Sequence, residues 1–234
     1  MTEKRLKKPY SALKGAIAMA ELFKKEMKLA SSPLSFLFIA AGLLAFCPGY
    51  PILCAAFFVC LGIFQSFRFA REANDIVYSS LLPIRKGDIV RGKYLFCAFI
   101  EMCGLLVSTA ATFVRMMLPD VTAYRENALM NANPAYLGFS LLIYGLFNAI
   151  FVCGFFKTAY NFVKPFVKYM IATFALIIIA EALHYFPGLE AVNSFGFDNI
   201  GLQLMILAGG AVLFALLTVL SEKRAMKHFE KVDL

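Results

Sequence analysis

Residues Gly87–Tyr94, with the sequence GDIVRGKY, come close to the spacing of a phosphate-binding loop. Such a loop follows a strand, wraps the phosphates with backbone N–H groups of small residues, and binds Mg²⁺ through a Ser or Thr after its lysine. Here Tyr94 takes the place of that hydroxyl residue, and Ile89 and Val90 crowd the backbone that would surround the phosphates. The sequence therefore predicts that this chain binds neither ATP nor any other cofactor.

Glu181 and His184 form a second chemical pattern, a Glu-x-x-His pair near the end of a hydrophobic segment. Di-iron helical bundles use this pair twice, with two further carboxylates, but only one copy occurs here. The chain also lacks the HExxH and GxSxG patterns of metalloproteases and serine hydrolases. We therefore expect a structural polar contact between Glu181 and His184, and predict no catalytic and no metal site.

Three more polar side chains, Gln65, Glu101 and Asn148, interrupt hydrophobic segments. An ionisable group at bilayer depth is costly and is a functional candidate by default, which singles out Glu101. The alternative is that Glu101 lies near the inner headgroups and pairs with an Arg or Lys there. Together with Glu181 and His184, these residues are the candidate intramembrane polar sites.

The composition indicates which elements must position these residues. The chain has 234 residues, of which 61% are hydrophobic and 16% are charged, and its mean hydropathy is +0.73. Soluble domains carry about a quarter charged residues, whereas an apolar helix of about 20 residues crosses a bilayer. We therefore predict an all-α, polytopic membrane protein, a single transmembrane domain over residues 1–234. Its six predicted spans are Leu34–Cys47, Pro51–Phe67, Tyr94–Leu118, Ala135–Phe156, Phe166–Phe186 and Leu202–Leu220. The first is short, so its helix is expected to begin upstream, near Met27.

The distribution of basic residues predicts the orientation. With these six spans, 21 of the 23 Lys and Arg residues fall on one side of the membrane, and only Arg115 and Arg125 fall on the other. By the positive-inside rule, both termini are cytoplasmic in a bacterial-type cytoplasmic membrane, inner or plasma. The net charge of +8 is then a topology signal with some attraction to anionic lipid, and no nucleic-acid partner is expected.

Two segments outside the spans have their own patterns. Residues 11–30 carry apolar side chains at three- and four-residue steps with lysines mostly on the other face, which is typical of a helix lying in the inner headgroup layer. The alternative is that this segment is only the extended start of the first span. Residues 187–201, with Pro187 and three glycines, lie outside the membrane or dip back into its outer leaflet.

Residues 72–92 link the second and third spans on the cytoplasmic side and are dense in both charge signs. Asp75 is expected to cap a short helix from Ile76 to Leu82 that Pro83 ends, and Asp88 to cap the next helix. The apolar side chains of the short helix form a surface that suits another protein: Ile76, Tyr78, Leu81 and Leu82. The alternative is a hairpin that only joins two spans.

This link also carries a family resemblance. The element Tyr-Ser-Ser-Leu-Leu-Pro-Ile at residues 78–84, followed by basic residues and by Asp-Ile-Val-x-Gly-Lys-Tyr-Leu at 88–95, resembles the permease subunits of ABC (ATP-binding cassette) type-2 transporters. Arg85 departs from the family pattern, which usually has Ser or Thr after Pro-Ile. The resemblance implies that residues 11–30 are an interfacial (elbow) helix and that residues 72–92 form a coupling helix on a separate ATPase subunit, which binds ATP and Mg²⁺. The implied ATPase contacts are Glu72, Asn74, Asp75, Tyr78, Leu81, Leu82, Pro83 and Arg85.

The resemblance further implies a function. Two permease subunits, a homodimer or a heterodimer, enclose the cargo path, with the second and fifth spans as its walls. Small members of the family export amphipathic peptides such as phenol-soluble modulins, so the expected cargo is an amphipathic peptide or another hydrophobic molecule moved by alternating access. Two alternatives stay open: a standalone ion-coupled secondary transporter or channel, and a membrane scaffold or enzyme.

Overall fold

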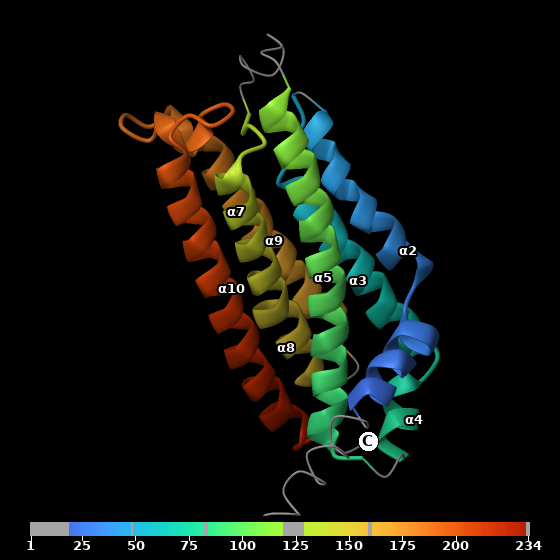
Figure 1. Cartoon of the computed structure of the whole chain (residues 1–234). Coiled ribbons are helices and arrows are strands. Elements are labelled where there is room, and N and C mark those ends of the chain that lie inside the picture. The colour runs from blue at the N-terminus through green and yellow to red at the C-terminus, as the bar shows by residue number, and fades with distance from the viewer. Residues whose placement is uncertain (1–18, 48, 82–83, 119–128, 159–160, 233–234) are drawn as a thin grey trace, which may run out of the picture.

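The computed structural model describes residues 19–47, 49–81, 84–118, 129–158 and 161–232, and all regular secondary structure in these ranges is helical (Figure 1). A helical stretch that is described from Met19 continues into the π-helical η1. The elements are η1 (Glu26–Ala30), α2 (Pro33–Leu37), the 3₁₀-helical η2 (Phe38–Phe46), α3 (Cys54–Glu72), α4 (Asp75–Leu81), α5 (Lys86–Met117), α7 (Pro134–Leu146), the π-helical η3 (Phe147–Val152), α8 (Cys153–Phe156), α9 (Val163–Ala182), the 3₁₀-helical η4 (Leu183–Tyr185) and η5 (Glu190–Asn193), and α10 (Ile200–Phe229).

Five helices in the described part of the chain are each long and apolar enough to cross a membrane: Cys54–Glu72, Lys86–Met117, Pro134–Phe156, Val163–Tyr185 and Ile200–Phe229. A sixth crossing is reached if the bent pair Met19–Lys28 and Pro33–Phe46 counts as one span. Within that pair, α2 and η2 hold only 14 residues. Because a 3₁₀-helix rises about 2.0 Å per residue against about 1.5 Å for an α-helix, these residues extend over roughly 25 Å. The 3₁₀ conformation thus lengthens the shortest predicted span towards membrane thickness.

The predicted start of the first span near Met27 is wrong. The N-terminal helix and the Pro33–Phe46 helix meet at an angle of 94°. Ser31 and Ser32 adopt extended backbone at the bend, the Ser32 hydroxyl accepts a hydrogen bond from Leu34 N, and Pro33 occupies the first helical position. A serine cap before a proline starts a new helix, so the chain turns here instead of running straight.

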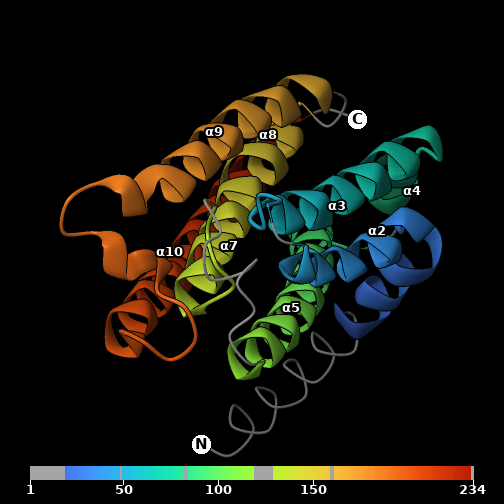
Figure 2. The same ribbon diagram turned by 90° about the horizontal axis from the view of Figure 1, so that it is seen from above.

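The helices form two groups that pack side by side. Viewed from above, α2, α3 and α5 lie on one side, and α7 to α10 lie on the other (Figure 2). The close approach of α7 and α10 depends on glycine, because a Cβ at Gly210 would overlap the Gly138 carbonyl and one at Gly138 would lie 2.6 Å from Ile206 O. Aromatic rings join the two groups: Phe67 lies 5.1 Å from Phe151 and 4.9 Å from Phe155, centroid to centroid.

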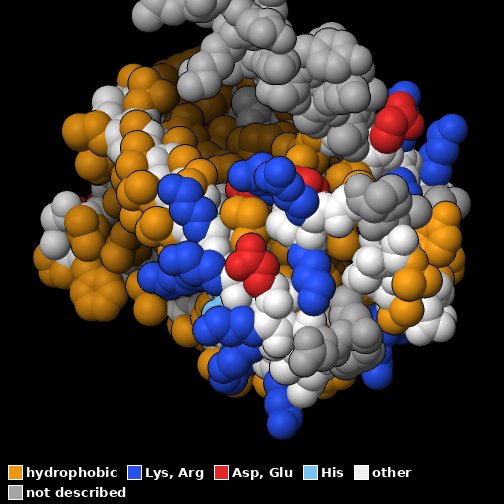
Figure 3. Space-filling model, turned by 90° about the horizontal axis from the view of Figure 1, so that it is seen from below, with side chains coloured by type: hydrophobic (Ala, Val, Ile, Leu, Met, Phe, Trp, Pro, Cys, Tyr) orange, Lys and Arg blue, Asp and Glu red, His pale blue; other side chains and the backbone are white. Residues whose placement is uncertain are grey.

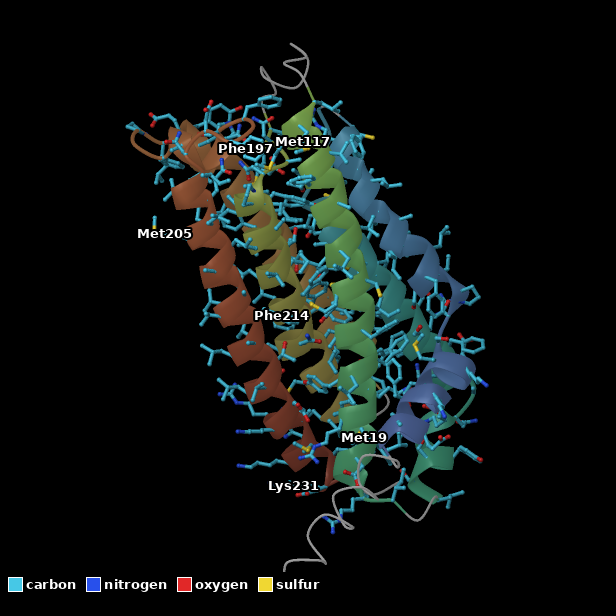
Figure 4. All side chains as sticks on the ribbon, viewed as in Figure 1. Met19, Met117, Phe197, Met205, Phe214 and Lys231 are labelled. Atoms are coloured by element: carbon cyan, nitrogen blue, oxygen red, sulfur yellow. The ribbon has the colours of Figure 1, made fainter. Side chains whose placement is uncertain are left out.

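Both described ends of the chain lie at one end of the bundle. Met19 and Lys231 are at the lower end in Figure 4, whereas Met117 and Phe197 are at the upper end. Seen from below, the lower end carries a gathering of Lys and Arg side chains (Figure 3). This arrangement agrees with an even number of crossings, and the assignment of the lower end to the cytoplasm stays a prediction from charge.

The link between α3 and α5 holds a short helix, α4, but both predicted caps are wrong. Asp75 is the first residue of α4 and follows Asn74, whose φ of 52° is left-handed, and its carboxylate pairs with lysines instead of capping. The helix α5 begins at Lys86, so Asp88 lies in its first turn instead of before it. Leu82 and Pro83 lie outside the described residues.

At the other end of the bundle, residues 187–201 include η5, whose Val192 is buried, and re-entry of this segment into the membrane stays a prediction.

Candidate functional site

The helix α4 presents an apolar surface at the end of the bundle that carries most basic residues. Leu81 is 81% exposed, more than any other large hydrophobic side chain in the described ranges, and Tyr78 is 57% exposed. Large exposed apolar side chains outside the membrane-spanning helices are candidates for contact with another protein. Among the other predicted ATPase contacts, the structure exposes Glu72, Asn74 and Arg85.

Asp75 is the exception in that predicted contact set, because it lies inside a buried cluster of four charges, Lys25, Glu26, Asp75 and Lys93. The Lys25 ammonium lies 2.7 Å from Asp75 Oδ1 and 3.0 Å from Glu26 Oε1, and it donates a hydrogen bond to Ser79 Oγ at 2.6 Å. The Lys93 ammonium lies 3.0 Å from Asp75 Oδ2 and also contacts Glu26 Oε2. The cluster therefore joins three segments, the N-terminal helix, α4 and α5.

The cluster is electrically balanced and shielded from solvent. Two ammonium groups face two carboxylates, and the side chains are between 2% and 11% exposed. Burial alone would raise the pKa of Asp75, but the ammonium groups of Lys93 and Lys25 outweigh it and hold this pKa below its usual value. Asp75 is thus ionised at neutral pH, and the charges hold one another in place.

Apolar contacts support the same junction. Ile76 of α4 is buried, and the Lys93 ammonium lies 5.7 Å from the centre of the Phe67 ring on α3. The rings of Phe23 on the N-terminal helix and Phe99 on α5 meet edge to face at 5.5 Å. The short helix α4 is therefore anchored to the bundle and does not hang from it as a loose loop.

A second polar cluster lies deeper along α5. Glu101 and Asn148 are both 0% exposed, and Asn148 Nδ2 donates hydrogen bonds to Glu101 Oε2 at 3.0 Å and to Thr218 Oγ1 of α10 at 3.1 Å. Glu101 follows the start of α5 by 15 residues, about 22 Å of helix. The alternative in which Glu101 pairs with a basic side chain near the headgroups is therefore wrong, since its partner in the described structure is an amide.

The π-helix η3 places Asn148 in this cluster. Asn148 is the second residue of η3, which interrupts the fourth span over Phe147–Val152. A π-turn shifts the helical register and is frequent at functional sites. The Tyr94 hydroxyl donates a hydrogen bond to the Asn148 carbonyl at 3.2 Å and so supports the widened turn from α5. The η3 backbone thus aims the Asn148 amide between α5 and α10.

The remaining intramembrane candidates do not join this cluster. Glu181 accepts a hydrogen bond from Met130 N at 2.6 Å, and the ring of His184 lies 4.1 Å from the ring of Tyr185, centroid to centroid, so the expected contact between Glu181 and His184 is wrong. Gln65 on α3 has a buried side-chain oxygen without a hydrogen-bond partner. Within the described ranges, no group of three or more His, Cys, Asp or Glu residues could hold a metal ion.

Sequence reasoning did not find the four-charge cluster or Thr218. The sequence pattern predicts that Lys25 lies on the polar face of a helix in the headgroup layer, and it includes Lys93 among the basic residues that indicate topology. The available signals were the adjacent opposite charges of Lys25 and Glu26 and the position of Lys93 directly before a long apolar stretch. Neither signal identifies the partner of a charge, because the three segments meet only in the folded chain.

Comparison with known proteins fits this architecture. A family model described as "ABC-2 family transporter protein" matches residues 21–230, from the N-terminal helix to the end of α10. Neither a curated protein nor a solved structure gives a match. The match covers most of the chain and includes both polar clusters. The chain therefore belongs to the ABC-2 family of transporter proteins, as a multi-pass membrane permease.

Proposed function

We propose that this chain is the permease subunit of an ATP-driven exporter and that α4 docks on a separate ATPase subunit. The observation that carries the proposal is the exposed apolar tip of α4, with Tyr78 and Leu81, on a helix that buried charges hold to the bundle. An exposed apolar patch outside the membrane is typical of a site that binds another protein. ATP and Mg²⁺ would be bound by that partner, since this chain has no phosphate-binding loop.

The four-charge cluster gives a physical route for coupling. A helix that moves with a partner transmits displacement only if it is rigidly attached to the elements it must move. Asp75 attaches α4 to Lys25 of the N-terminal helix and to Lys93 of α5. Closure of the ATPase would therefore move the N-terminal helix and the third span together with α4. Asp75 then acts inside the permease as a residue that positions α4, and its exposed neighbours make the contact with the ATPase.

The transport unit in this proposal contains two copies of the chain in a bacterial-type cytoplasmic membrane, with both termini in the cytoplasm. Exposed apolar side chains on α9, among them Ile171, Ile178 and Ile179, face lipid or the second copy. With α3 and α9 as walls of the path between the copies, the lining would be largely apolar. Such a path suits an amphipathic peptide or another hydrophobic cargo.

One observation favours a second candidate, a standalone ion-coupled transporter. Glu101 is a fully buried carboxyl at membrane depth, as proton and ion pathways require. This candidate would move cargo without an ATPase, and Glu101→Gln would abolish its transport.

A co-purification experiment separates the two candidates. The tagged chain is extracted from its native membranes in mild detergent, and ATP hydrolysis and bound proteins are measured. We expect wild type to recover an ATPase subunit, and Leu81→Asp to recover at least tenfold less. Lys157→Asp, a charge change at an exposed position outside α4, is the matched control and should behave like wild type. Equal recovery with Leu81→Asp would contradict docking at α4, and recovery of the chain alone would favour the ion-coupled transporter.

A further inference from the structure

The cluster of Glu101, Asn148 and Thr218 contains more hydrogen-bond acceptors than its donors can satisfy. Both hydrogen-bonding directions of the Asn148 amide nitrogen are used, by Glu101 and by Thr218. Two fully buried oxygens, Glu101 Oε1 and Asn148 Oδ1, have no hydrogen-bond partner. The Thr218 hydroxyl oxygen accepts one bond and keeps a second lone pair. Three acceptor positions on hydrogen-bonded neighbours, one of them on a carboxyl, therefore have no donor among the described residues.

The described part of the chain supplies no positive charge to this carboxyl. Lys93, two turns earlier on α5, is engaged by Glu26 and Asp75, and Arg91 pairs with Asp88 and with Glu222. A buried carboxylate without a countercharge is strongly disfavoured. The carboxyl of Glu101 must therefore either hold a proton or receive a cation from outside the chain.

A groove between α5 and α10 reaches this cluster at Thr218. Its volume is about 310 Å³, and its walls include Tyr94, Leu95 and Ala98 of α5 and Thr218 of α10. Arg91 and Glu222 also line it, and their side chains lie 3.5 Å apart. Helical spacing places Glu101 one turn beyond Ala98 on α5. Thr218 belongs to both the groove and the polar cluster, and the Asn148 amide links its hydroxyl to the Glu101 carboxyl through two hydrogen bonds.

We propose that this groove and the Glu101–Asn148–Thr218 cluster form a binding site for the protonated amine of an amphipathic molecule that enters from the inner headgroup layer. An alkylammonium group has three N–H donors, which match the three free acceptors, and its charge neutralises the carboxylate. Its apolar part would lie along Leu95 and Ala98. A bare metal ion fits less well, because hard cations take six or more oxygen ligands.

Binding exchanges one charge for another at Glu101. In the empty site the carboxyl holds a proton. When the ammonium enters, the O–H bond breaks, the proton leaves to solvent through the groove, and the carboxylate pairs with the ammonium. One proton is released for each ammonium bound, and the buried site stays neutral throughout. The inference goes beyond the proposed function, because it requires neither an ATPase subunit nor net transport.

The test uses the purified full chain in nanodiscs of zwitterionic lipid, without any ATPase. The probe is n-octylammonium, and n-octanol is the neutral probe of equal chain length. Thermal unfolding is followed with a thiol-reactive dye, since Cys60 and Cys97 are buried in the folded chain. Infrared difference spectra report the C=O stretch of a protonated carboxyl. Three variants are compared with wild type: Glu101→Gln, Thr218→Val and the matched control Glu181→Gln, which alters another buried carboxyl of the chain.

We expect octylammonium, and not octanol, to raise the unfolding temperature of wild type and of Glu181→Gln and to remove the protonated-carboxyl band. Glu101→Gln should bind at least tenfold more weakly and lack that band, and Thr218→Val should bind more weakly than wild type. Equal stabilisation by octanol, or undiminished binding by Glu101→Gln, would overturn the proposal. So would a band that persists at saturating octylammonium, because a proton would then be the permanent neutralising partner of Glu101.

Discussion

Replacing Lys93 by Met tests whether the four-charge cluster holds the N-terminal helix, α4 and α5 together. Met keeps the apolar stem but removes the ammonium, which is 3% exposed and touches both Glu26 and Asp75. Two buried carboxylates would then share the single ammonium of Lys25, which leaves one uncompensated negative charge. Removing one partner of a buried ion pair costs about 3–5 kcal/mol. For a chain of this size, 1 kcal/mol corresponds to about 2–4 °C, so the unfolding temperature should fall by roughly 6–20 °C.

The assay is thermal unfolding of the purified chain in nanodiscs. Lys24→Met is the matched control, because the Lys24–Glu21 pair is about two-thirds exposed and should contribute less than about 1 kcal/mol. The double variant Lys93→Met/Glu26→Gln restores charge balance and leaves the Lys25–Asp75 pair intact, so it should regain at least about 2 kcal/mol over the additive expectation. Strictly additive effects would contradict energetic coupling between the four buried charges. A loss of stability in Lys93→Met as small as that in Lys24→Met would contradict it as well.

Two further predictions concern close packing and pH. Gly210→Ala should destabilise the chain by roughly 1–3 kcal/mol in the same assay, because the added Cβ would overlap the Gly138 carbonyl. A Cβ added at Gly209 would have no neighbouring atom within 4 Å, so Gly209→Ala should be neutral or slightly stabilising. Equal effects of the two variants would exclude the glycine contact between α7 and α10. Because the pKa of Asp75 lies below its ordinary value of about 3.9, ionised Asp75 stabilises the fold above that pH, and this contribution disappears as the pH falls through the lowered pKa. The difference in unfolding temperature between wild type and Asp75→Asn should thus be constant from about pH 5 to 8 and shrink below about pH 4, and a difference that shrinks already near neutrality would contradict an ionised Asp75.

The membrane-spanning helices were predictable because each one leaves a long apolar stretch in the sequence. Five of the six predicted spans stand as separate spanning helices, and α5 and α10 extend beyond the predicted apolar stretches into charged residues at the basic end of the bundle. The first span was misplaced at its start, because the short apolar stretch suggested that its helix extends upstream, whereas Ser32 and Pro33 turn the backbone there. Hydropathy indicates which residues lie in the membrane, but it does not show where the backbone bends.

The polar sites were predictable only as single residues. Glu101 and Asn148 stood out because each is polar within an apolar helix, and the structure joins them. Thr218 carried no such signal, because threonine is common in membrane helices. The partners of Asp75 come from segments 50 residues earlier and 18 residues later. A cap and a buried ion pair use the same carboxylate, and only the packing of the N-terminal helix against α4 decides between them.

Photocrosslinking from position 81 would test the central claim, that α4 docks on an ATPase, most directly. A photoreactive amino acid replaces Leu81 in the full chain, expressed in its native cells, and illumination is followed by mass spectrometry of the products. Position 157 carries the same group as a control. The proposed function predicts a covalent adduct with an ATPase subunit from position 81, and none from position 157. Efficient labelling of lipid or water alone at position 81, with no protein adduct, would contradict it.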